Sequence, residues 1–131
     1  MPVADTELLF ALNPKDKKHG EAMRSLSLKG LKIPDTAIFE FQIVLRARSR
    51  TTKEIASAMR AIKQISESRK LKEVCTMKSD LFIRQAEIEE KEGLSYFDSL
   101  IAASALAVDS AILSDDSAFD RVQGLKRIPL G

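Results

Sequence analysis

The feature that most restricts the fold of this chain is a repeated switch between short apolar runs and longer stretches with helical periodicity. Strands are expected at residues 2–5, 31–34, 71–76, 111–114 and 126–130. Strands that alternate with helices pair in parallel through helical crossovers. The pattern therefore predicts the α/β fold class, as a three-layer α/β/α arrangement with a short, mainly parallel central sheet.

The helices between these strands are marked by their caps and apolar stripes. Thr51 and Glu54 match a capping box, and Gly30 and Gly93 are favourable helix terminators. Helices are expected at residues 8–12, 15–29, 35–49, 51–66, 79–92 and 97–108. The last is the most apolar, and its alanines allow close approach to a neighbour, so we expect it to be central.

Length and composition limit the class of protein. A chain of 131 residues with 44% apolar content fits one domain with one core, spanning residues 1–131. It has no apolar run near 18 residues and no signal-peptide pattern, so we expect a cytoplasmic protein without a membrane segment. The only cysteine, Cys75, cannot form an internal disulfide and is expected in the core.

Four acidic residues, Asp5, Glu40, Asp98 and Asp116, stand where an apolar segment starts, stops or is interrupted. Burying a carboxylate is costly unless a partner compensates its charge. Because ligands bind beyond the carboxyl ends of parallel strands, Asp5 and Asp116 are expected at one edge of the sheet. Glu40 and Asp98 are expected to reach it from the inward faces of two helices, Glu40 on a stripe with Thr36, Ile43, Val44 and Ala47.

Oxygen ligands of this kind suit Mg²⁺ or Mn²⁺, whereas His19 and Cys75 do not form a zinc pattern. Such ions hold phosphodiesters and activate water, so no covalent protein nucleophile is needed. The sequence thus predicts a metal-dependent phosphodiesterase site in which the four acids are both metal ligands and catalytic residues.

These segments resemble the PIN-domain family, in particular the small ribonucleases of VapC-type toxins, over essentially the whole chain. The resemblance rests on Asp5-Thr6 before Leu8-Leu9, on Glu40, on residues 94–105 around Asp98, and on residues 113–119 around Asp116. It implies a parallel sheet between helices, Mg²⁺ or Mn²⁺ in an acidic pocket, endoribonuclease activity, a homodimer and an antitoxin partner. Glu7 replaces the family's usual Asn, and Ala118 replaces a frequent Asp.

Further residues are candidates for supporting roles. Thr6, Ser114 and Asp115 are expected beside the acids, where they would orient a carboxylate or water. Arg46, Arg48, Arg50 and Lys53 are candidate RNA-binding residues, and a second basic run covers residues 69–72. Apolar residues that could contact an antitoxin or a second copy are Ile55, Met59, Ile62, Phe82 and Ile83.

Other interpretations stay open at this point. Asp5, Asp98 and Asp116 could be helix caps, Glu40 could pair with Arg46 or Arg84, and the basic runs could be solvated helix ends. The alternative function is a non-catalytic PIN-fold module that binds RNA or protein. A phosphoacceptor domain fits Asp5-Thr6-Glu7 poorly, and no glycine-rich phosphate loop supports nucleotide binding.

Overall fold

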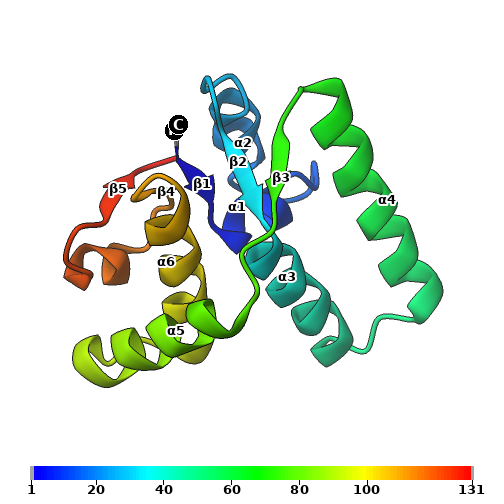
Figure 1. Cartoon of the computed structure of the whole chain (residues 1–131). Coiled ribbons are helices and arrows are strands. Elements are labelled where there is room, and N and C mark those ends of the chain that lie inside the picture. Colours follow the sequence, from blue (N-terminus) through cyan, green and yellow to red (C-terminus); the bar gives the residue numbers. More distant parts are fainter. Residues whose placement is uncertain (1, 131) are drawn as a thin grey trace.

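A computed structural model describes residues 2–130 and contains one five-stranded sheet (Figure 1). Its strands are β1 (Val3–Ala4), β2 (Lys32–Pro34), β3 (Lys72–Val74), β4 (Ala111–Leu113) and β5 (Lys126–Ile128). Their order is β3-β2-β1-β4-β5, and every neighbouring pair is parallel. The α/β prediction is confirmed, and the sheet of the described residues is parallel throughout.

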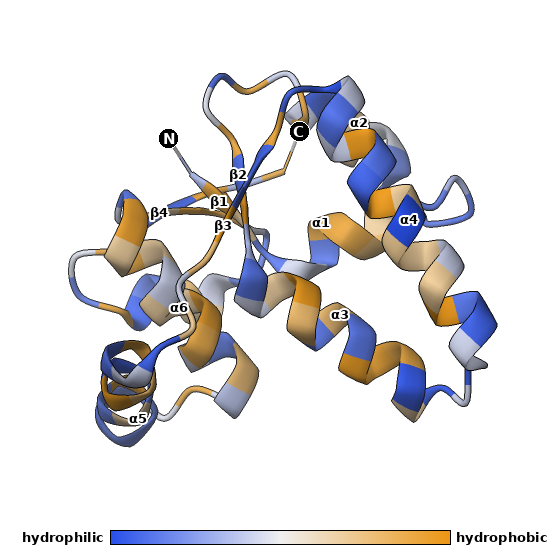
Figure 2. Cartoon of the chain, turned by 45° about the vertical axis from the view of Figure 1, so that its right-hand side comes forward, coloured by the Kyte–Doolittle hydropathy of each residue, from blue (hydrophilic) through white to orange (hydrophobic). Residues whose placement is uncertain are grey.

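Helices cover both faces of this sheet (Figure 2). They are α1 (Thr6–Ala11), α2 (His19–Ser25), α3 (Asp35–Ala47), α4 (Thr52–Ser68), α5 (Ser79–Glu92), α6 (Tyr96–Val108) and the short 3₁₀ helix η1 (Ser117–Arg121). Helix α6 contacts β1, β2 and β4 directly, as its small side chains predict, and α5 packs along its outer side. No helix within residues 2–130 is both long and apolar enough to cross a bilayer.

Successive strand residues belong alternately to two apolar clusters, because their side chains point to opposite faces of the sheet. Val3 and Ile112 lie in the cluster that includes Ile101 of α6, while Ala4 and Leu113 lie in the cluster that includes Leu8 of α1. Each of these strand side chains is fully buried. Burial on both faces explains why the central strands are continuous apolar runs.

The caps fix several helix boundaries as predicted. The Thr51 hydroxyl accepts from the Glu54 N–H, and the Glu54 carboxylate accepts from the Thr51 N–H, which completes a capping box. Gly93 ends α5 in the left-handed conformation at φ 67°. Glycine adopts that conformation without the steric cost that other residues carry.

Two local predictions are wrong. The helix expected over residues 15–29 covers only His19–Ser25, because the Asn13 and Asp16 side chains accept from the N–H groups two residues ahead and form turns. Cys75 is exposed rather than in the core. Strand β3 ends at Val74 and lies at the edge of the sheet, so Cys75 falls on the connection to α5.

The inward face of α3 is also shifted from the predicted stripe. Thr36, Ala37 and Phe41 are its buried residues, whereas Ile43 and Ala47 are exposed. Glu40 therefore stands at the margin of the buried face and is half-buried. This position leaves its carboxylate accessible from the carboxyl edge of the sheet.

Candidate active site

The four acids come from four separate segments that meet at the carboxyl edge of the sheet. Asp5 follows β1 and caps α1, while Asp116 follows β4 and caps η1. Glu40 lies in α3, and Asp98 lies in the first turn of α6. In addition to burial, which is the main cause, the charge of Asp98 raises the pKa of both Asp5 and Glu40, and the charge of Asp116 raises the pKa of Asp98. The carboxylates are therefore close enough to repel one another.

Asp5 is the most deeply buried of the four, with 7% of its surface exposed. Its carboxylate accepts from the Thr6 N–H at 2.7 Å and from the Ser114 hydroxyl at 2.7 Å. Burial is the main reason that its pKa rises from 3.8 to about 7, and the neighbouring charges of Glu7 and Asp98 add to the shift. Asp5 is thus poised to exchange a proton for a cation near neutral pH.

Thr6 links two of the acids. Its backbone N–H donates to Asp5, and its hydroxyl donates to Glu40 Oε1 at 2.5 Å. Burial nevertheless raises the pKa of Glu40, together with the charge of Asp98. The alternative pairing of Glu40 with Arg46 or Arg84 is not formed among the described residues. Thr6 therefore lies between Asp5 and Glu40 and donates a hydrogen bond to each.

Ser114 is fully buried between β4 and the acids, and its hydroxyl has three neighbours. It accepts from the Asp116 N–H at 3.0 Å and lies 2.7 Å from Asp5 Oδ2 and 3.2 Å from Glu7 Oε1. A hydroxyl carries a single proton, so the shorter distance favours donation to Asp5. Ser114 therefore orients Asp5 while it holds the backbone that carries Asp116.

Asp98 and Asp116 form the outer part of the site. Burial raises the pKa of the half-buried Asp98, and the nearby Asp116 carboxylate raises it further. The Ser95 hydroxyl accepts from the Asp98 N–H at 3.2 Å, so the N-cap residue of α6 is Ser95 rather than Asp98. Asp116 is exposed and accepts from the Ala118 N–H at 2.9 Å. It is both a cap and a member of the acidic group.

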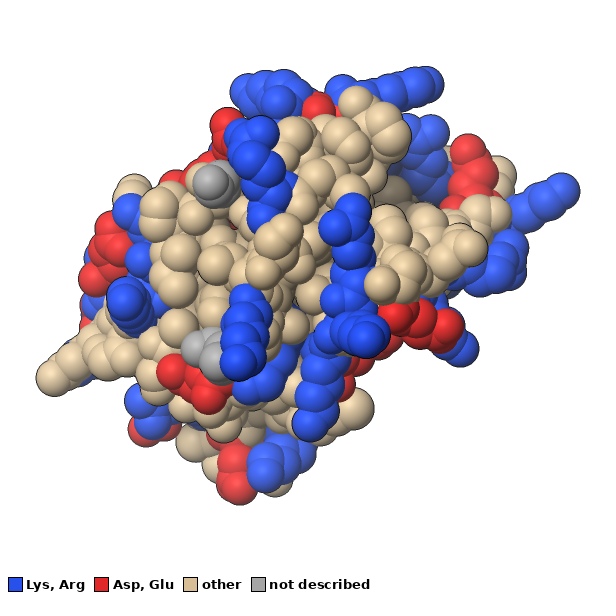
Figure 3. Space-filling view, turned by 90° about the horizontal axis from the view of Figure 1, so that it is seen from above, with Lys and Arg blue, Asp and Glu red and all other residues tan. Residues whose placement is uncertain are grey.

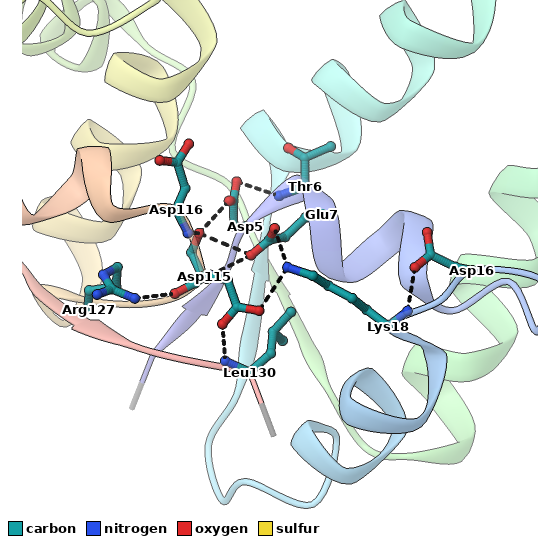
Figure 4. A network of polar contacts seen from close by, with 10 residues as sticks. Asp5, Thr6, Glu7, Asp16, Lys18, Asp115, Asp116, Arg127 and Leu130 are labelled. Carbon is teal, nitrogen blue, oxygen red and sulfur yellow. Dashed lines mark hydrogen bonds and ion pairs between the residues drawn. The ribbon is translucent and has the colours of Figure 1, made fainter.

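A second polar network, which includes a lysine that sequence reasoning missed, lies beside these acids (Figure 4). Lys18 Nζ lies 2.9 Å from Asp115 Oδ2 and 3.8 Å from Glu7 Oε2. Glu7 accepts from the Asp115 N–H at 2.5 Å, and Asp115 accepts from the Leu130 N–H at 2.9 Å. Lys18 holds the pKa of Asp115 below its usual range. Asp115 is thus turned toward Lys18 and the C-terminal segment.

The donor set consists of oxygen atoms, which suits Mg²⁺ or Mn²⁺. As they stand, no three carboxylate, histidine or cysteine side chains among residues 2–130 are grouped closely enough to hold a metal ion. Burial and, to a smaller extent, mutual repulsion raise the pKa values of Asp5, Glu40 and Asp98, and a bound cation would offset both costs. The chemistry of the residues therefore fits such an ion, while their spacing would have to contract around it.

The predicted RNA-binding cations lie away from the acids, where α3 ends and α4 begins. The Arg48 guanidinium lies 4.9 Å from the centre of the Phe10 ring, and Arg50 pairs with Glu54 at 3.9 Å. Arg46 and Lys53 are exposed on either side. At 1.5 Å per helical residue, Arg48 is about 12 Å along α3 from Glu40. Arg48 and Arg50 border an apolar groove rather than the acidic site.

That groove runs between α1, α3 and α4 and has a volume of about 570 Å³. Its lining includes Phe10, Phe41, Leu45 and Ile62. Of the apolar residues predicted as contacts, Ile55 and Ile62 are buried, and Met59 is partly buried against the core. Phe82 and Ile83, in contrast, are 40% and 60% exposed on α5. The predicted set thus falls on two separate surfaces.

A parallel sheet with carboxylates from four segments at its carboxyl edge defines a class of α/β proteins with an acidic site at the strand ends. Within that class, the PIN domain family model matches residues 3–125. The chain therefore belongs to the PIN domain family, as its resemblance implied.

Solved structures of similar fold cover nearly the whole chain. One, from Mycobacterium tuberculosis, is VapC20, described as a sarcin-ricin loop cleaving toxin; it has 20% identity and a TM-score of 0.70 over 92% of this chain and 93% of that one. Another is from the VapBC2 assembly of Rickettsia felis bound to a promoter DNA fragment, with 18% identity and a TM-score of 0.69 over 98% of each chain.

A third is from VapBC-1 of Haemophilus influenzae, with 17% identity and a TM-score of 0.65 over 97% of this chain and 96% of that one. Identities this low establish similarity of fold. No curated protein sequence matches the chain significantly.

Proposed function

We propose that this protein is a metal-dependent endoribonuclease that hydrolyses RNA phosphodiester bonds with an activated water. The observation that carries the proposal is the convergence of Asp5, Glu40, Asp98 and Asp116 at one edge, with raised pKa values in the first three. Perturbed acids in one cluster are typical of functional sites. Membership of the PIN domain family agrees with this chemistry.

Asp5, Glu40, Asp98 and Asp116 would hold Mg²⁺ or Mn²⁺. When bound, such an ion lowers the pKa of water and stabilises the charge on the leaving oxygen. The chain's own contribution is placement. The Thr6 N–H and the Ser114 hydroxyl each donate to the Asp5 carboxylate at 2.7 Å, and the Thr6 hydroxyl donates to Glu40 Oε1 at 2.5 Å. Acids held in this way lose little freedom when a cation and a phosphate arrive.

Solved structures similar to this chain include a toxin-antitoxin complex from Klebsiella pneumoniae, and we propose that this protein is likewise the toxin of a toxin-antitoxin pair. Helices α1, α3 and α4 border an apolar groove of about 570 Å³, and Arg48 and Arg50 stand at its rim. An amphipathic segment of an antitoxin with acidic flanks is complementary to this groove. The exposed Phe82 and Ile83 of α5 are the surface we assign to a homodimer.

The direct test uses purified protein and an Asp98→Asn variant with mixed labelled RNAs in Mn²⁺, in Mg²⁺ and in EDTA. We expect cleavage by the parent protein only with metal, and none by the variant, which also controls for contaminating nucleases. If folded parent protein binds RNA but leaves it intact in every metal condition, the proposal fails for those substrates. The non-catalytic module would then be favoured, and Glu7 and Ala118 would be the residues to explain it.

A further inference from the structure

The side of the sheet at which the strands begin, opposite the acids, carries a group of cations that have no role in the proposed hydrolysis. Parallel strands all begin at one edge, and Lys32 and Lys72 are the first residues of β2 and β3. They are register partners, so their side chains lie on the same face of the sheet. Lys29, Arg69 and Lys70 stand in the loops that enter these two strands. We call these five residues the basic edge.

Seen from above, with the starts of β2 and β3 toward the viewer, this side of the molecule displays many lysine and arginine side chains (Figure 3). Acidic side chains lie mainly toward its margin. Lys32 pairs with Asp109, and Glu73 is exposed on β3 next to Lys72. Among the described residues, the remaining four cations of the basic edge form no side-chain ion pair. Their charge is available to a partner.

A hollow of about 530 Å³ lies between the two loops of the basic edge. Lys29, Arg69 and Lys70 line it, together with Ser27, Ser68 and several leucines, and none of its described lining residues is acidic. The two loops come from different parts of the chain and place cations on both sides of the same depression. A concave surface with charge of one sign concentrates counter-ions more strongly than a flat one.

The backbone at Lys70 provides an independent observation. Lys70 has φ 56° and follows α4 in a Schellman arrangement, in which the Leu71 N–H donates to the Ser66 carbonyl at 2.8 Å and the Lys70 N–H to the Glu67 carbonyl at 3.3 Å. Glycine is the residue favoured there. The fold therefore does not require lysine at this position, and a glycine would relieve the backbone. The backbone conformation at this position thus gives no reason for a lysine.

The dipole of α4 explains part of this charge but not all of it. Arg69 and Lys70 at the carboxyl end of a helix are favourable there. Lys72 is not at a helix end and forms no ion pair among the described residues, whereas its register partner Lys32 pairs with Asp109. A bound polyanion with regularly spaced charges would supply partners to the cations that have none. Phosphate groups of a nucleic acid backbone have this character.

We propose that the basic edge binds the backbone phosphates of the RNA substrate at a part of the molecule remote from the bond that is cut. This inference rests on the proposed ribonuclease function. Three-residue strands separate the two edges by about 10 Å, before loops and side chains are added. One RNA must therefore extend around the side of the protein to touch both edges. The substrate that follows is an RNA long enough to reach both, such as a long hairpin, rather than a short single strand.

The test compares a Lys29→Gln, Lys70→Gly, Lys72→Gln triple variant with a matched Lys63→Gln, Lys78→Gln, Lys91→Gln triple variant, in which the altered lysines are exposed elsewhere. Both are made in the parent protein and in the Asp98→Asn background. Binding of a long hairpin RNA by the Asp98→Asn proteins is measured in EDTA over a range of salt concentrations. Cleavage by the parent protein and by the two triple variants with Asp98 intact is measured on the same hairpin and on a short single strand.

For the basic-edge variant we expect the slope of log affinity against log salt to fall by about 0.7–0.9 for each lysine that contacts a phosphate. The KM for the hairpin should rise with kcat unchanged, while the short strand should be cut as before. The matched variant should behave as its parent in each assay. Thermal melting checks folding, and Lys70→Gly alone should melt no lower than the parent protein.

Equal salt slopes and equal hairpin affinities for the two triple variants would overturn the inference, even if the protein proves to be a nuclease. A selective loss of hairpin binding by the basic-edge variant, in a protein that cleaves neither RNA, would support phosphate binding at this edge and refute the proposed nuclease. The binding arm needs no metal. The two proposals therefore fail separately.

Discussion

The Ser114 hydroxyl lies 2.7 Å from Asp5 Oδ2 and joins residues that are 109 positions apart in the chain. This contact connects Ser114, the first residue after β4, to the N-cap residue of α1. It is also one of only two hydrogen bonds to the Asp5 carboxylate among the described residues, the other coming from the Thr6 N–H. Among the described residues, Ser114 is thus the one side chain that donates a hydrogen bond to the most buried acid.

Replacing Ser114 by alanine removes that donor and leaves Asp5 with one partner. We expect metal-dependent cleavage to fall about 10–100-fold, as for other residues that orient metal ligands. Stability should fall by about 1–3 kcal/mol, because a buried group loses its partner. Ser114→Thr keeps the hydroxyl and should retain most of the activity. If alanine and threonine variants lose activity equally, the role of Ser114 is packing rather than orientation.

The stability of the metal-free protein should depend on pH through Asp5. Its pKa is about 7 in the folded protein and 3.8 in the reference state, so the folded state holds a proton that the unfolded state releases between those values. The folded state is therefore favoured at low pH and loses that advantage as pH rises toward 7. Asp5→Asn removes this dependence.

In EDTA, the melting temperature of Asp5→Asn relative to the parent protein should rise from pH 4 to about pH 7 and level off above it. The change across this range corresponds to about 2–4 kcal/mol. Asp16→Asn is the control, since it lies outside the acidic site. If the difference in melting temperature between Asp5→Asn and the parent protein stays constant with pH, the pKa of Asp5 is near its ordinary value.

Glu7 adds negative charge beside Asp5 and raises its pKa. In Glu7→Gln the side-chain oxygen can still accept from the Asp115 N–H, while the charge is gone. The pKa of Asp5 should fall, so the acid limb of the cleavage profile should move to lower pH by a few tenths of a unit to about one unit. Glu87→Gln, on the outer face of α5, should leave the profile unchanged. A shift toward higher pH would contradict this account.

Mn²⁺ should stabilise the folded protein, because it binds carboxylates that repel one another in its absence. At 100 times its dissociation constant, a ligand specific to the folded state adds about 2.7 kcal/mol. The gain measured by thermal melting should grow from pH 6 to pH 8 as Asp5 loses its proton. It should be much smaller in Asp98→Asn. Equal melting temperatures with Mn²⁺ and with EDTA at pH 8 would argue against metal binding at the acids.

Cys75 should react rapidly with a thiol reagent in the native protein, since it is exposed on the connection between β3 and α5. We expect its labelling rate to be within about tenfold of the rate in denaturant, because no local opening is needed. A protected thiol would mean that this connection is covered in solution. The measurement should be repeated at several protein concentrations, so that association with a second copy is separated from burial within one chain.

The sequence predicted the fold class because strand and helix periodicities are local, and it predicted the caps at Thr51 and Gly93 for the same reason. It predicted Asp5 and Asp116 as neighbours because both follow apolar runs that end as parallel strands. The Lys18–Asp115 ion pair could not be foreseen, since it joins residues 97 apart and Lys18 lies in an ordinary polar stretch. The exposure of Cys75 was missed because its apolar neighbours do not reveal that β3 stops one residue earlier at the sheet edge.

The uniform direction of the sheet has a practical consequence for modifying this molecule. Every loop that enters a strand lies at one end and every loop that leaves a strand lies at the other, so the two sets of loops can be exchanged independently. Replacing the loops before β2 and β3 with those of a relative would alter the proposed RNA-binding surface while leaving the acids in place. Replacing the segments that follow β1 and β4 would alter the acidic site and leave that surface unchanged. Chimeras built at strand boundaries are therefore the natural way to separate target choice from turnover in this chain.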